Sequence, residues 1–478
     1  MSTSTTILWY RQDLRLADHP ALLRAADRGT VLPVFIWAPE EEGDWPLGGA
    51  SKWWLHHSLD SLTEQLEGMG SRLILRQGNS LKVLSELIQQ TGASAVYWSR
   101  RYEPAAIERD QRVKSALKQD GIEVKSFNGS LLYEPWEIET KAGGPYKVFT
   151  PFWKACRALH IDHDPREPPE GLISPRRWPK SVELADLKLL PEPDWDSQFY
   201  ETWDVGARAA EDALNAFISE GRLGDYQEAR NRLDVQGWSQ LSPRLHFGEI
   251  SPRQVWASVK AAYNGAPSLR KSSDTYLSEI GWREFAYHLL YYFPSTTNEP
   301  LREKFAVFPW DEDNEKLQKW QRGQTGYPVV DAAMRDLWAT GFMPNRARMI
   351  VASFLTKHLR IPWQRGAEWF WDTLCDADLA SNSLGWQWTA GCGADAAPYF
   401  RIFNPMTQGE KFDPDGDYVR RWVPEIAGLP NKVLDKPWEA SEEQLEEAGI
   451  TLGKDYPHPM VDHFEARDAA LAAYNQIK

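Results

Sequence analysis

Short apolar runs and longer amphipathic stretches alternate over residues 6–128 of the chain. The apolar runs have the length and the β-branched or aromatic content of buried strands. They cover Thr6–Tyr10, Val31–Trp37, Arg72–Leu75, Ala95–Trp98 and Glu123–Phe127. Apolar residues recur at helical spacing in Pro20–Ala26, Lys52–Met69, Ser80–Thr91 and Pro104–Asp120. Strands that alternate with helices of this length predict an α/β fold with a doubly wound parallel sheet.

The alternation ends near residue 130 and a different pattern follows. Asp164–Pro193 is dense in Pro and charged residues, which is typical of an irregular connector. From Gly206 onward helical spacing dominates, beginning with Ala207–Glu220. We therefore expect an α/β domain over residues 1–131, a linker over 132–205 and an all-helical domain over 206–478.

Charge and composition limit the classes of function that the chain can have. The 478-residue chain carries a net charge of −14, and because Lys and Arg supply the affinity for phosphates, a nucleic-acid partner requires a local basic patch. No apolar run approaches the roughly 20 residues that span a bilayer, and the N-terminus does not resemble a signal peptide. Three cysteines are too few for an iron–sulfur cluster or a disulfide framework. We expect a cytoplasmic protein with no metal and no membrane partner.

Tryptophan is unusually frequent, with 24 residues, and several lie in or near the stretch Cys375–Pro405. This stretch mixes two carboxylates, an amide, paired Trp residues and Gly-rich turns, whereas a core helix would show an apolar stripe at a period of 3.6. The mixture suits the wall of a site for a polar aromatic ligand. A buried helix-turn-helix with aromatic packing is the alternative interpretation.

Three motifs in this stretch resemble the flavin-binding core of the photolyase/cryptochrome family. They are Asp-x-Asp-Leu-Ala-x-Asn, Gly-Trp-Gln-Trp and Asp-Ala-Ala-Pro-Tyr-Phe-Arg-Ile-Phe-Asn-Pro. The resemblance extends from Trp9 to about Val423, and it implies a Rossmann-like N-terminal domain and an all-α FAD-binding domain. The opening Trp9–Leu16 is similar to the start of the family's N-terminal domain, which helps to hold an antenna chromophore. For Arg11, Asp13 and Arg15 the alternative is a surface ion-pair cluster.

The resemblance also assigns the residues that contact FAD. Gly237–Pro243 has the character of a turn that enters a helix, where hydroxyls and free N–H groups bind anions; read alone, it is a helix cap. Trp238 stands where relatives commonly have Thr. The implied FAD contacts are Tyr226, Ser239, Gln240, Leu241, Ser242, Tyr276, Arg348, Asp376, Asp378 and Asn382.

A second implied group surrounds the DNA lesion. Glu279 and Trp282 are spaced i, i+3, and Asn345 and Met349 are spaced i, i+4, so each pair shares a helix face. In the family Trp282 would stack on damaged bases and Glu279 would hydrogen-bond a thymine edge, with Trp388 opposite. Asn345 and Met349 fit repair of cyclobutane pyrimidine dimers better than repair of the (6-4) photoproduct. Asn382 would lie by flavin N5, where plant cryptochromes typically carry Asp.

Electron transfer and DNA binding complete the implied site. The family's flavin is reduced from the surface through a chain of tryptophans, which Trp386, Trp363 and Trp310 match, and Trp338 is a candidate side branch. Taken alone, each of these residues would be interpreted as part of the hydrophobic core. The basic residues that could contact DNA are Arg230, Arg283, Arg346, Arg401 and Lys411.

Together these features predict a carbon–carbon lyase of class III or class I that repairs cyclobutane pyrimidine dimers in ultraviolet-damaged DNA with light and FADH⁻. The alternative is a cryptochrome, a flavin photoreceptor without repair activity. A generic flavin oxidoreductase would need a nicotinamide site, and no Gly-x-Gly-x-x-Gly follows the first strand. The expected antenna is 5,10-methenyltetrahydrofolate, with a deazaflavin or a second flavin as alternatives because Ala105 and Ala106 replace an Asn and a Glu of folate-binding relatives. We expect a monomer.

Overall fold

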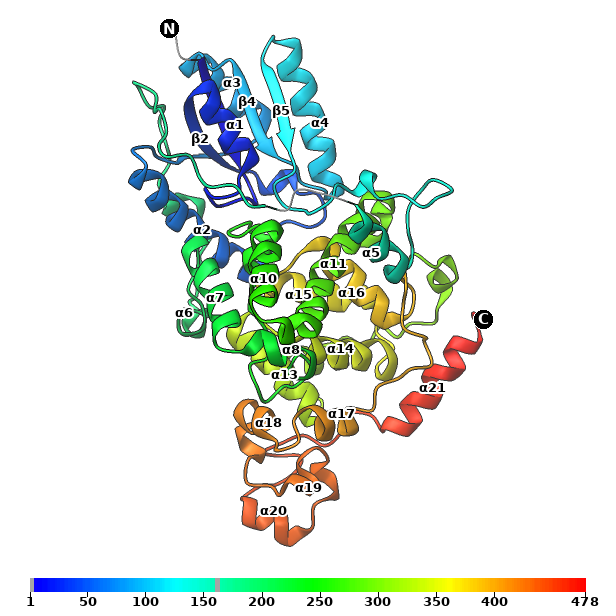
Figure 1. The fold of residues 1–478 in the computed structure, drawn as a ribbon. Helices are drawn as coiled ribbons and strands as arrows, with labels where there is room; N and C mark the ends of the chain where they lie inside the picture. Colours follow the sequence, from blue (N-terminus) through cyan, green and yellow to red (C-terminus); the bar gives the residue numbers. More distant parts are fainter. Residues whose placement is uncertain (1–3, 160–163) are drawn as a thin grey trace. The chain divides into compact units, whose positions relative to one another are not determined.

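A computed structural model describes residues 4–159 and 164–478 of the chain (Figure 1). The described chain divides into two compact units, which we treat separately. Unit 1 takes in the described residues up to Gly224, together with Ser239–Pro294 and Cys375–Leu379. Unit 2 takes in Asp225–Trp238, Ser295–Leu374 and Ala380–Lys478. The boundaries expected at residues 131 and 205 stay predictions.

Unit 1 contains the predicted parallel sheet (Figure 1). All four strand pairs are parallel, and the spatial order β3-β2-β1-β4-β5 is that of a doubly wound fold, which confirms the predicted fold class. The third strand begins two residues later than predicted, because pairing with β2 starts where Val34 meets Ile74. The strands are β1 (Ser4–Tyr10), β2 (Gly29–Trp37), β3 (Ile74–Gln77), β4 (Ala95–Ser99) and β5 (Glu123–Phe127).

Four helices cross over between the strands, as predicted: α1 (Pro20–Arg28), α2 (Gly49–Gly68), α3 (Ser80–Thr91) and α4 (Pro104–Gln119). Ile7 and Trp9 of β1 share a core with apolar residues of α3 and α4. Because side chains alternate along a strand, Tyr10 points to the opposite face, where its ring contacts His19 at the start of α1. The sheet is thus covered on both faces.

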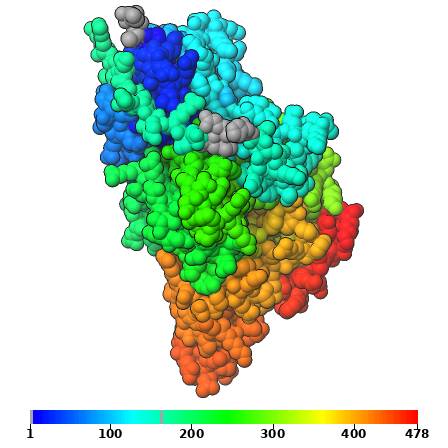
Figure 2. Space-filling view, viewed as in Figure 1, coloured from blue at the N-terminus to red at the C-terminus, as the bar shows by residue number. Residues whose placement is uncertain are grey.

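The Pro-rich segment after residue 163 is irregular, as predicted, apart from the short 3₁₀ helix η3 (Leu184–Leu187). It is tied to the sheet through the backbone, because Val31 N–H donates to Ile173 O at 2.9 Å and Val182 N–H donates to Leu75 O at 3.1 Å. Figure 2 shows the teal chain of this segment on the surface.

The rest of unit 1 is helical and centres on α11 (Arg270–Tyr292), whose middle is buried. Gly281 lets α5 approach α11, since a Cβ at this position would lie 2.7 Å from the Trp153 ring. This contact fixes the helix turn that carries Trp282. The other helices are α5 (Phe149–Ala158), α6 (Ser197–Thr202), α7 (Ala207–Ser219), α9 (Ser242–His246) and α10 (Pro252–Gly265), with 3₁₀ helices η1 (Pro39–Glu41), η2 (Pro135–Glu137) and η4 (Pro267–Leu269).

Unit 2 is built from helices, which agrees with the helical C-terminal domain expected from Gly206 onward. Helix α14 continues directly into a π-helical turn, η7 (Phe354–His358), a feature often found at functional sites. The α-helices are α12 (Asn314–Gln321), α13 (Pro328–Thr340), α14 (Asn345–Ser353), α15 (Trp363–Thr373), α16 (Leu379–Ala390), α17 (Pro405–Phe412), α18 (Asp417–Trp422), α19 (Asn431–Leu434), α20 (Glu442–Ala448) and α21 (His463–Asn475). Helix α8 (Arg222–Ala229) spans the point where the units divide, and the 3₁₀ turns are η5 (Pro294–Thr297), η6 (Glu303–Val307), η8 (Pro424–Ile426) and η9 (Pro437–Glu439).

Among residues 4–159 and 164–478, none of the helices combines the length and the apolar character needed to cross a bilayer.

Candidate functional site

The two predicted carboxylates of the flavin site, Asp376 and Asp378, are buried in the segment Cys375–Leu379 of unit 1. The Tyr287 hydroxyl donates to Asp378 Oδ2, and His246 Nδ1 lies 3.4 Å from the same oxygen. Burial alone would raise the pKa of Asp378, but the hydrogen bond and charge of His246, the charge of Arg283 and the Tyr287 hydroxyl together hold it below its usual value. Asp378 is therefore a fixed, ionised acceptor inside the protein.

Residues 239–243 of the predicted phosphate turn lie in the same unit, whereas Gly237 and Trp238 belong to unit 2. Tyr276 on α11 donates its hydroxyl to Ser239 Oγ at 2.9 Å, and Gln240 takes a left-handed backbone conformation with φ of 57°. Leu241 is buried and Ser242 is exposed. The helix that follows, α9, has only five residues. Binding of an anion here would therefore depend on the hydroxyls of Ser239 and Ser242 more than on a helix dipole.

Trp282 has the geometry of a stacking platform. Its ring lies flat on Phe149 of α5, with centroids 3.9 Å apart and an interplanar angle of 9°, and Phe285 meets its edge. The side chain remains half-buried, as does Glu279 one helical turn earlier. One face of the indole is thus supported by the protein, and a further ring could stack on what remains exposed.

Helix α14 of unit 2 presents the predicted pair Asn345 and Met349 on one face. Asn345 is exposed, and its amide nitrogen lies 3.9 Å from the Met349 sulfur. On the same helix Arg348 donates from Nε to Met343 O at 2.7 Å and lies over the Phe342 ring. The helix therefore holds these three side chains in defined positions.

Helix α16 carries the predicted residues Asn382, Trp386 and Trp388 along almost its whole length. The Asn382 amide donates to Ala367 O on α15 at 3.0 Å, which fixes its orientation and leaves its oxygen available as an acceptor. Trp388 is half-buried. Asn382 can therefore present a hydrogen-bond acceptor from a rigid helix.

The three residues of the predicted tryptophan chain differ in burial. Trp386 and Trp363 are buried, whereas Trp310 is half-exposed. Gly366, one turn after Trp363 on α15, lets the Trp386 ring lie directly on the helix backbone. The backbone N–H of Asp311, next to Trp310, donates to Arg360 O, three residues before Trp363. The three residues thus lie on adjoining segments and run from the core to the surface. Trp338, the candidate side branch, stacks on Trp369 at 5.9 Å and 7°.

Basic residues gather at α14 and α17 of unit 2. Burial lowers the pKa of Arg346, and the positive charges of Arg230 and Arg401 lower it further. Positive charges that lie close together in this way attract anions. Lys411 is exposed and lies over the Phe412 ring, on which the Arg346 guanidinium also packs.

A buried lysine supports this patch. Lys357 in the π-helical turn donates to the carbonyl oxygen of Arg401 at 2.9 Å. Burial, with a smaller effect of the Arg401 charge, lowers the pKa of Lys357 to about 7. This hydrogen bond therefore holds the loop that carries Arg401 against the π-helical turn.

Arg283 differs from the other predicted DNA contacts. Its side chain is 12% exposed, donates to Ser130 O at 2.6 Å and lies over the Tyr287 ring in unit 1. Because internal partners hold the guanidinium, its position does not favour the expected DNA contact. Arg283 instead contributes to the field that keeps Asp378 ionised.

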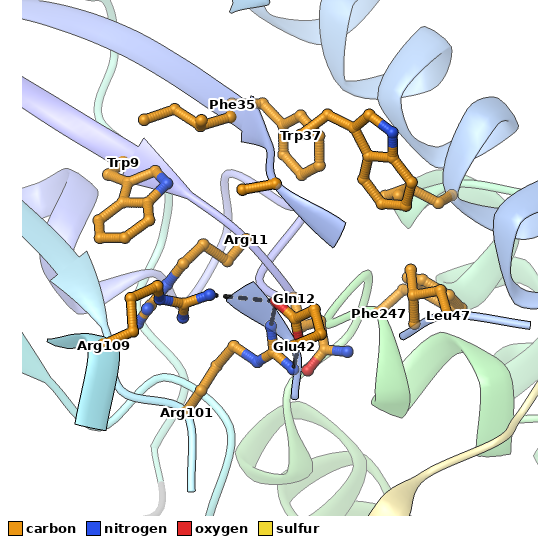
Figure 3. A pocket seen from close by; sticks show the side chains of 13 residues that line it. Trp9, Arg11, Gln12, Phe35, Trp37, Glu42, Leu47, Arg101, Arg109 and Phe247 are labelled. Carbon is orange, nitrogen blue, oxygen red and sulfur yellow. Dashed lines mark hydrogen bonds and ion pairs between the residues drawn. The ribbon is translucent and has the colours of Figure 1, made fainter. Parts of the chain in front are cut away.

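A pocket opens at the carboxyl end of the sheet in unit 1 (Figure 3). The empty space at this pocket, counted together with open solvent, is about 490 Å³. Rings of Trp9, Phe35, Trp37 and Phe247 line it, together with Arg11, Arg101 and Arg109. Apolar rings beside clustered arginines suit a flat aromatic ligand with an anionic tail.

Glu42 organises the arginines of this pocket. It accepts from Arg101 at 2.8 Å and from Arg109 at 3.1 Å (Figure 3). Burial would raise the pKa of Glu42, but the charges of these two arginines outweigh it and keep the group ionised. Trp9 Nε1 is buried and has no hydrogen-bond partner among the described residues. A bound ligand could supply one.

The alternative of a surface ion-pair cluster for Arg11, Asp13 and Arg15 is wrong, because all three side chains are buried. Arg11 lines the pocket, where it forms an ion pair with Asp110 at 2.7 Å. Asp13 pairs with His19, and Arg15 donates to backbone carbonyls.

The predicted residues therefore fall into two groups. Unit 1 holds Ser239, Gln240, Leu241, Ser242, Tyr276, Glu279, Trp282, Arg283, Asp376 and Asp378. Unit 2 holds Tyr226, Arg230, Trp310, Asn345, Arg346, Arg348, Met349, Trp363, Asn382, Trp386, Trp388, Arg401 and Lys411.

Sequence reasoning missed His246, Tyr287, Phe149 and Glu42 as site residues. His246 lies three residues after the predicted phosphate turn and Tyr287 lies within the helix of Trp282, but no local spacing links either residue to Asp378.

Comparisons with known proteins agree with this arrangement. Residues 6–170 match the family model described as DNA photolyase, and residues 276–476 match the model described as FAD binding domain of DNA photolyase. The chain belongs to the photolyase/cryptochrome family, and it carries that family's FAD-binding domain. It is 50% identical to the deoxyribodipyrimidine photo-lyase of Agrobacterium fabrum, over 100% of this chain and 99% of the relative. It is 40% identical to cryptochrome-2 of Arabidopsis thaliana, over 99% of this chain and 79% of the relative.

Comparison with solved structures indicates which class of photolyase the chain resembles. The crystal structure of a bacterial class III photolyase from Agrobacterium tumefaciens matches with a TM-score of 0.95 at 49% identity, over 100% of this chain and 98% of the other. An archaeal photolyase from Sulfolobus tokodaii, solved with two FAD molecules, matches with a TM-score of 0.82 at 28% identity, over 99% and 100%. The predicted resemblance to a class III photolyase is confirmed.

Proposed function

We propose that this protein is a light-driven DNA-repair enzyme that splits cyclobutane pyrimidine dimers in ultraviolet-damaged DNA. The observation that carries the proposal is the Trp282 ring, which lies flat on Phe149 and stays half-buried beside Glu279. A ring supported on one face is suited to stack on a base that has left the duplex, and each such stack is worth about 1–3 kcal/mol. The 50% identity to a deoxyribodipyrimidine photo-lyase supports the same reaction.

FAD is the cofactor, and the donor set fits it. The ionised, buried Asp378 can accept N–H groups of the flavin ring, and the hydroxyls of Ser239 and Ser242 can donate to phosphate. The other proposed FAD contacts are Asp376, Tyr276, Arg348, Gln240, Leu241 and Tyr226, the last of which lies on α8. The flavin supplies one-electron chemistry when it is reduced and illuminated.

The chain's own residues position the reaction. Asn382, whose amide donates to Ala367 O, would lie by flavin N5 and could offer its amide oxygen there. Asn345, Met349 and Trp388 line the lesion pocket, and Glu279 hydrogen-bonds a base edge. Trp386, Trp363 and Trp310 carry electrons from the surface.

DNA binds through a local basic patch on an acidic protein. Arg230, Arg346, Arg401 and Lys411 form it. Burial lowers the pKa of Arg346 most, and the nearby charges of Arg230 and Arg401, which lower it further, support this role. Neutralising phosphates releases counterions, so binding should weaken steeply with salt.

The pocket of Figure 3 is the proposed antenna site. Methenyltetrahydrofolate fits its combination of aromatic walls and arginines, because folates join a flat ring system to an anionic tail. A deazaflavin or a second flavin would satisfy the same walls. Release of the bound chromophores by denaturation, followed by their absorption spectra, distinguishes these ligands, and Trp37→Ala should lower the antenna content without loss of FAD.

The protein is further proposed to act as a cytoplasmic monomer. Its three cysteines are buried free thiols, as a reducing compartment favours. Light scattering during size-exclusion chromatography would test the monomer.

The proposed function is tested with chemically reduced protein and an oligonucleotide that bears one thymine dimer. Illumination should restore the ultraviolet absorbance of the intact bases, and a dark sample should stay unchanged. If an illuminated protein binds the oligonucleotide with fully reduced flavin and restores nothing, the proposal is wrong and a cryptochrome function is favoured.

A further inference from the structure

A row of aromatic side chains connects Asp378 with the surface of unit 1. Tyr287 donates its hydroxyl to Asp378, and its ring centroid lies 5.8 Å from that of Tyr102. The next step, from Tyr102 to Trp136, is 6.4 Å. Tyr287 and Tyr102 are buried, whereas Trp136 is 42% exposed. The row therefore runs from the proposed cofactor site to solvent.

Both phenols in this row are hydrogen-bonded to carboxylates. Tyr287 donates to Asp378, and Tyr102 donates to Glu134 Oε2 at 2.7 Å. Burial, followed by the charge of the neighbouring carboxylate, raises the pKa of each tyrosine well above its usual value, so both phenols are neutral at physiological pH. Each tyrosine thus has a proton acceptor in place at the oxygen that would lose a proton on oxidation.

The segment that carries Glu134 and Trp136 is held firmly against α11. Glu284 accepts from the N–H groups of Leu132 and Tyr133 at 2.9 and 3.1 Å. His288 Nδ1 lies 3.1 Å from Pro135 O. The distances between the rings are therefore maintained by buried polar contacts from the same helix that carries Tyr287.

Positive charge lies over both ends of the row. The Arg283 guanidinium is 4.9 Å from the Tyr287 ring centroid, and that of Arg100 is 5.7 Å from the Trp136 centroid. A cation over a ring disfavours a second positive charge on that ring. Oxidation of Tyr287 is therefore favoured only when its proton leaves together with the electron, and Asp378 is there to accept it.

We propose that Tyr287, Tyr102 and Trp136 form a proton-coupled electron relay, which we call the tyrosine relay, that supplies electrons to the flavin from a thiol reductant in solution. The relay rests on the proposed function, because Asp378 must lie at the flavin. Its residues are separate from Trp386, Trp363 and Trp310.

The relay steps balance in electrons and protons. One electron leaves Tyr287 for the illuminated, oxidised flavin, and the phenolic proton passes to Asp378. An electron from Tyr102 then restores Tyr287, which recovers its proton from Asp378, while Tyr102 gives its own proton to Glu134. Trp136 next donates an electron to Tyr102 and loses its indole proton to solvent, because Arg100 disfavours a positive charge on that ring, and Glu134 returns the proton to Tyr102. A thiolate in solution reduces Trp136, which takes a proton back from solvent, and two resulting thiyl radicals join in a disulfide.

A merely structural role for the two hydroxyls makes different predictions. If Tyr102 only anchors Glu134, its removal should change stability and leave the photochemistry untouched, because Arg100 also holds that carboxylate at 2.9 Å. Tyr97 offers a matched control. It is a buried tyrosine of unit 1 whose hydroxyl donates to Glu123 at 2.6 Å, and it stands outside the row.

The test uses the illuminated holoenzyme with Trp386→Phe as the background, which closes the tryptophan chain. Tyrosyl radicals are detected by electron paramagnetic resonance without thiol, and accumulation of reduced flavin is followed with thiol. Tyr287→Phe should lower the tyrosyl signal by roughly tenfold or more, and Tyr102→Phe should slow reduced-flavin accumulation by a similar factor. Tyr97→Phe should change neither.

A tyrosyl signal that persists in Tyr287→Phe, or reduced flavin that accumulates at an unchanged rate in Tyr102→Phe, would overturn the relay. Repair is measured on the same samples after chemical reduction, which bypasses the relay. If the Trp386→Phe background protein itself gives no tyrosyl signal but still repairs DNA, the relay alone is contradicted. An intact relay without repair contradicts the proposed function alone.

Discussion

The tryptophan chain of unit 2 and the tyrosine relay of unit 1 lie in contrasting surroundings. Trp386 packs against Phe370 and Trp320, and its indole nitrogen has no hydrogen-bond partner among the described residues. Tyr287 and Tyr102, by contrast, each donate to a buried carboxylate. An apolar shell lets an electron leave without moving a proton, whereas a phenol bonded to a carboxylate couples the two. The surroundings of the rings, more than the rings themselves, therefore distinguish the two routes.

The largest expected effect concerns base stacking by Trp282, in which neither electron route takes part. Trp282→Ala should weaken binding to dimer-containing DNA by about 1–3 kcal/mol, or roughly 5- to 150-fold, because the supported ring is removed. Fluorescence anisotropy of a labelled oligonucleotide measures this loss. Trp136→Ala is the control, since it removes an exposed tryptophan of the same unit that belongs to the relay. Equal losses in both variants would show that stacking is not specific to Trp282.

The next effect concerns the tryptophan chain alone. Trp386→Phe should slow photoreduction of the oxidised flavin by roughly tenfold or more, equivalent to about 1.4 kcal/mol of barrier, because Phe is not readily oxidised. The disappearance of the oxidised-flavin absorption band under light with thiol measures the rate. Chemically reduced Trp386→Phe should still repair DNA. An unchanged photoreduction rate would remove the chain from the account.

A smaller effect distinguishes the routes by their protons. In heavy water the residual photoreduction of Trp386→Phe should slow, because a proton moves with each electron along the relay. Photoreduction in the protein with an intact tryptophan chain should respond less. The same rate measurement in both solvents decides the matter, and a larger isotope effect with the chain intact would reverse the assignment of the two routes.

The smallest expected effect concerns charge. Arg346→Ala should reduce by about 1 the slope of log binding constant against log salt, since one phosphate contact is lost. Lys319→Ala is the control, because this exposed lysine pairs with Glu315 on α12. A salt titration of DNA binding measures both slopes. If the slopes agree, Arg346 does not contact phosphate.

The fold could be predicted well from the sequence, because its strands and helices follow from local patterns of apolar and polar residues. Apolar runs such as Val31–Trp37 lie in strands that are buried on both faces, and the parallel order follows from the helices between them. The third strand was shifted by two residues, since its bounds depend on pairing with Val34 and not on its own composition.

The candidate site was predictable only where motifs are contiguous. The segment with Asp376 and Asp378 and the helix with Trp282 were found in this way, although their assigned roles stay proposals. The partners of Asp378 were not found, because His246 and Tyr287 are distant in sequence and reach it only through tertiary packing. The contact of Arg283 with Ser130 was missed for the same reason, because no local pattern indicates it.

The most direct test of the central claim compares two lesions in one experiment. Chemically reduced protein is illuminated with one oligonucleotide that bears a thymine dimer and another that bears a (6-4) photoproduct, and intact strands are counted by chromatography. The account predicts light-dependent restoration of the dimer substrate and none of the other. Restoration of neither substrate, with both bound and the flavin fully reduced, would contradict it.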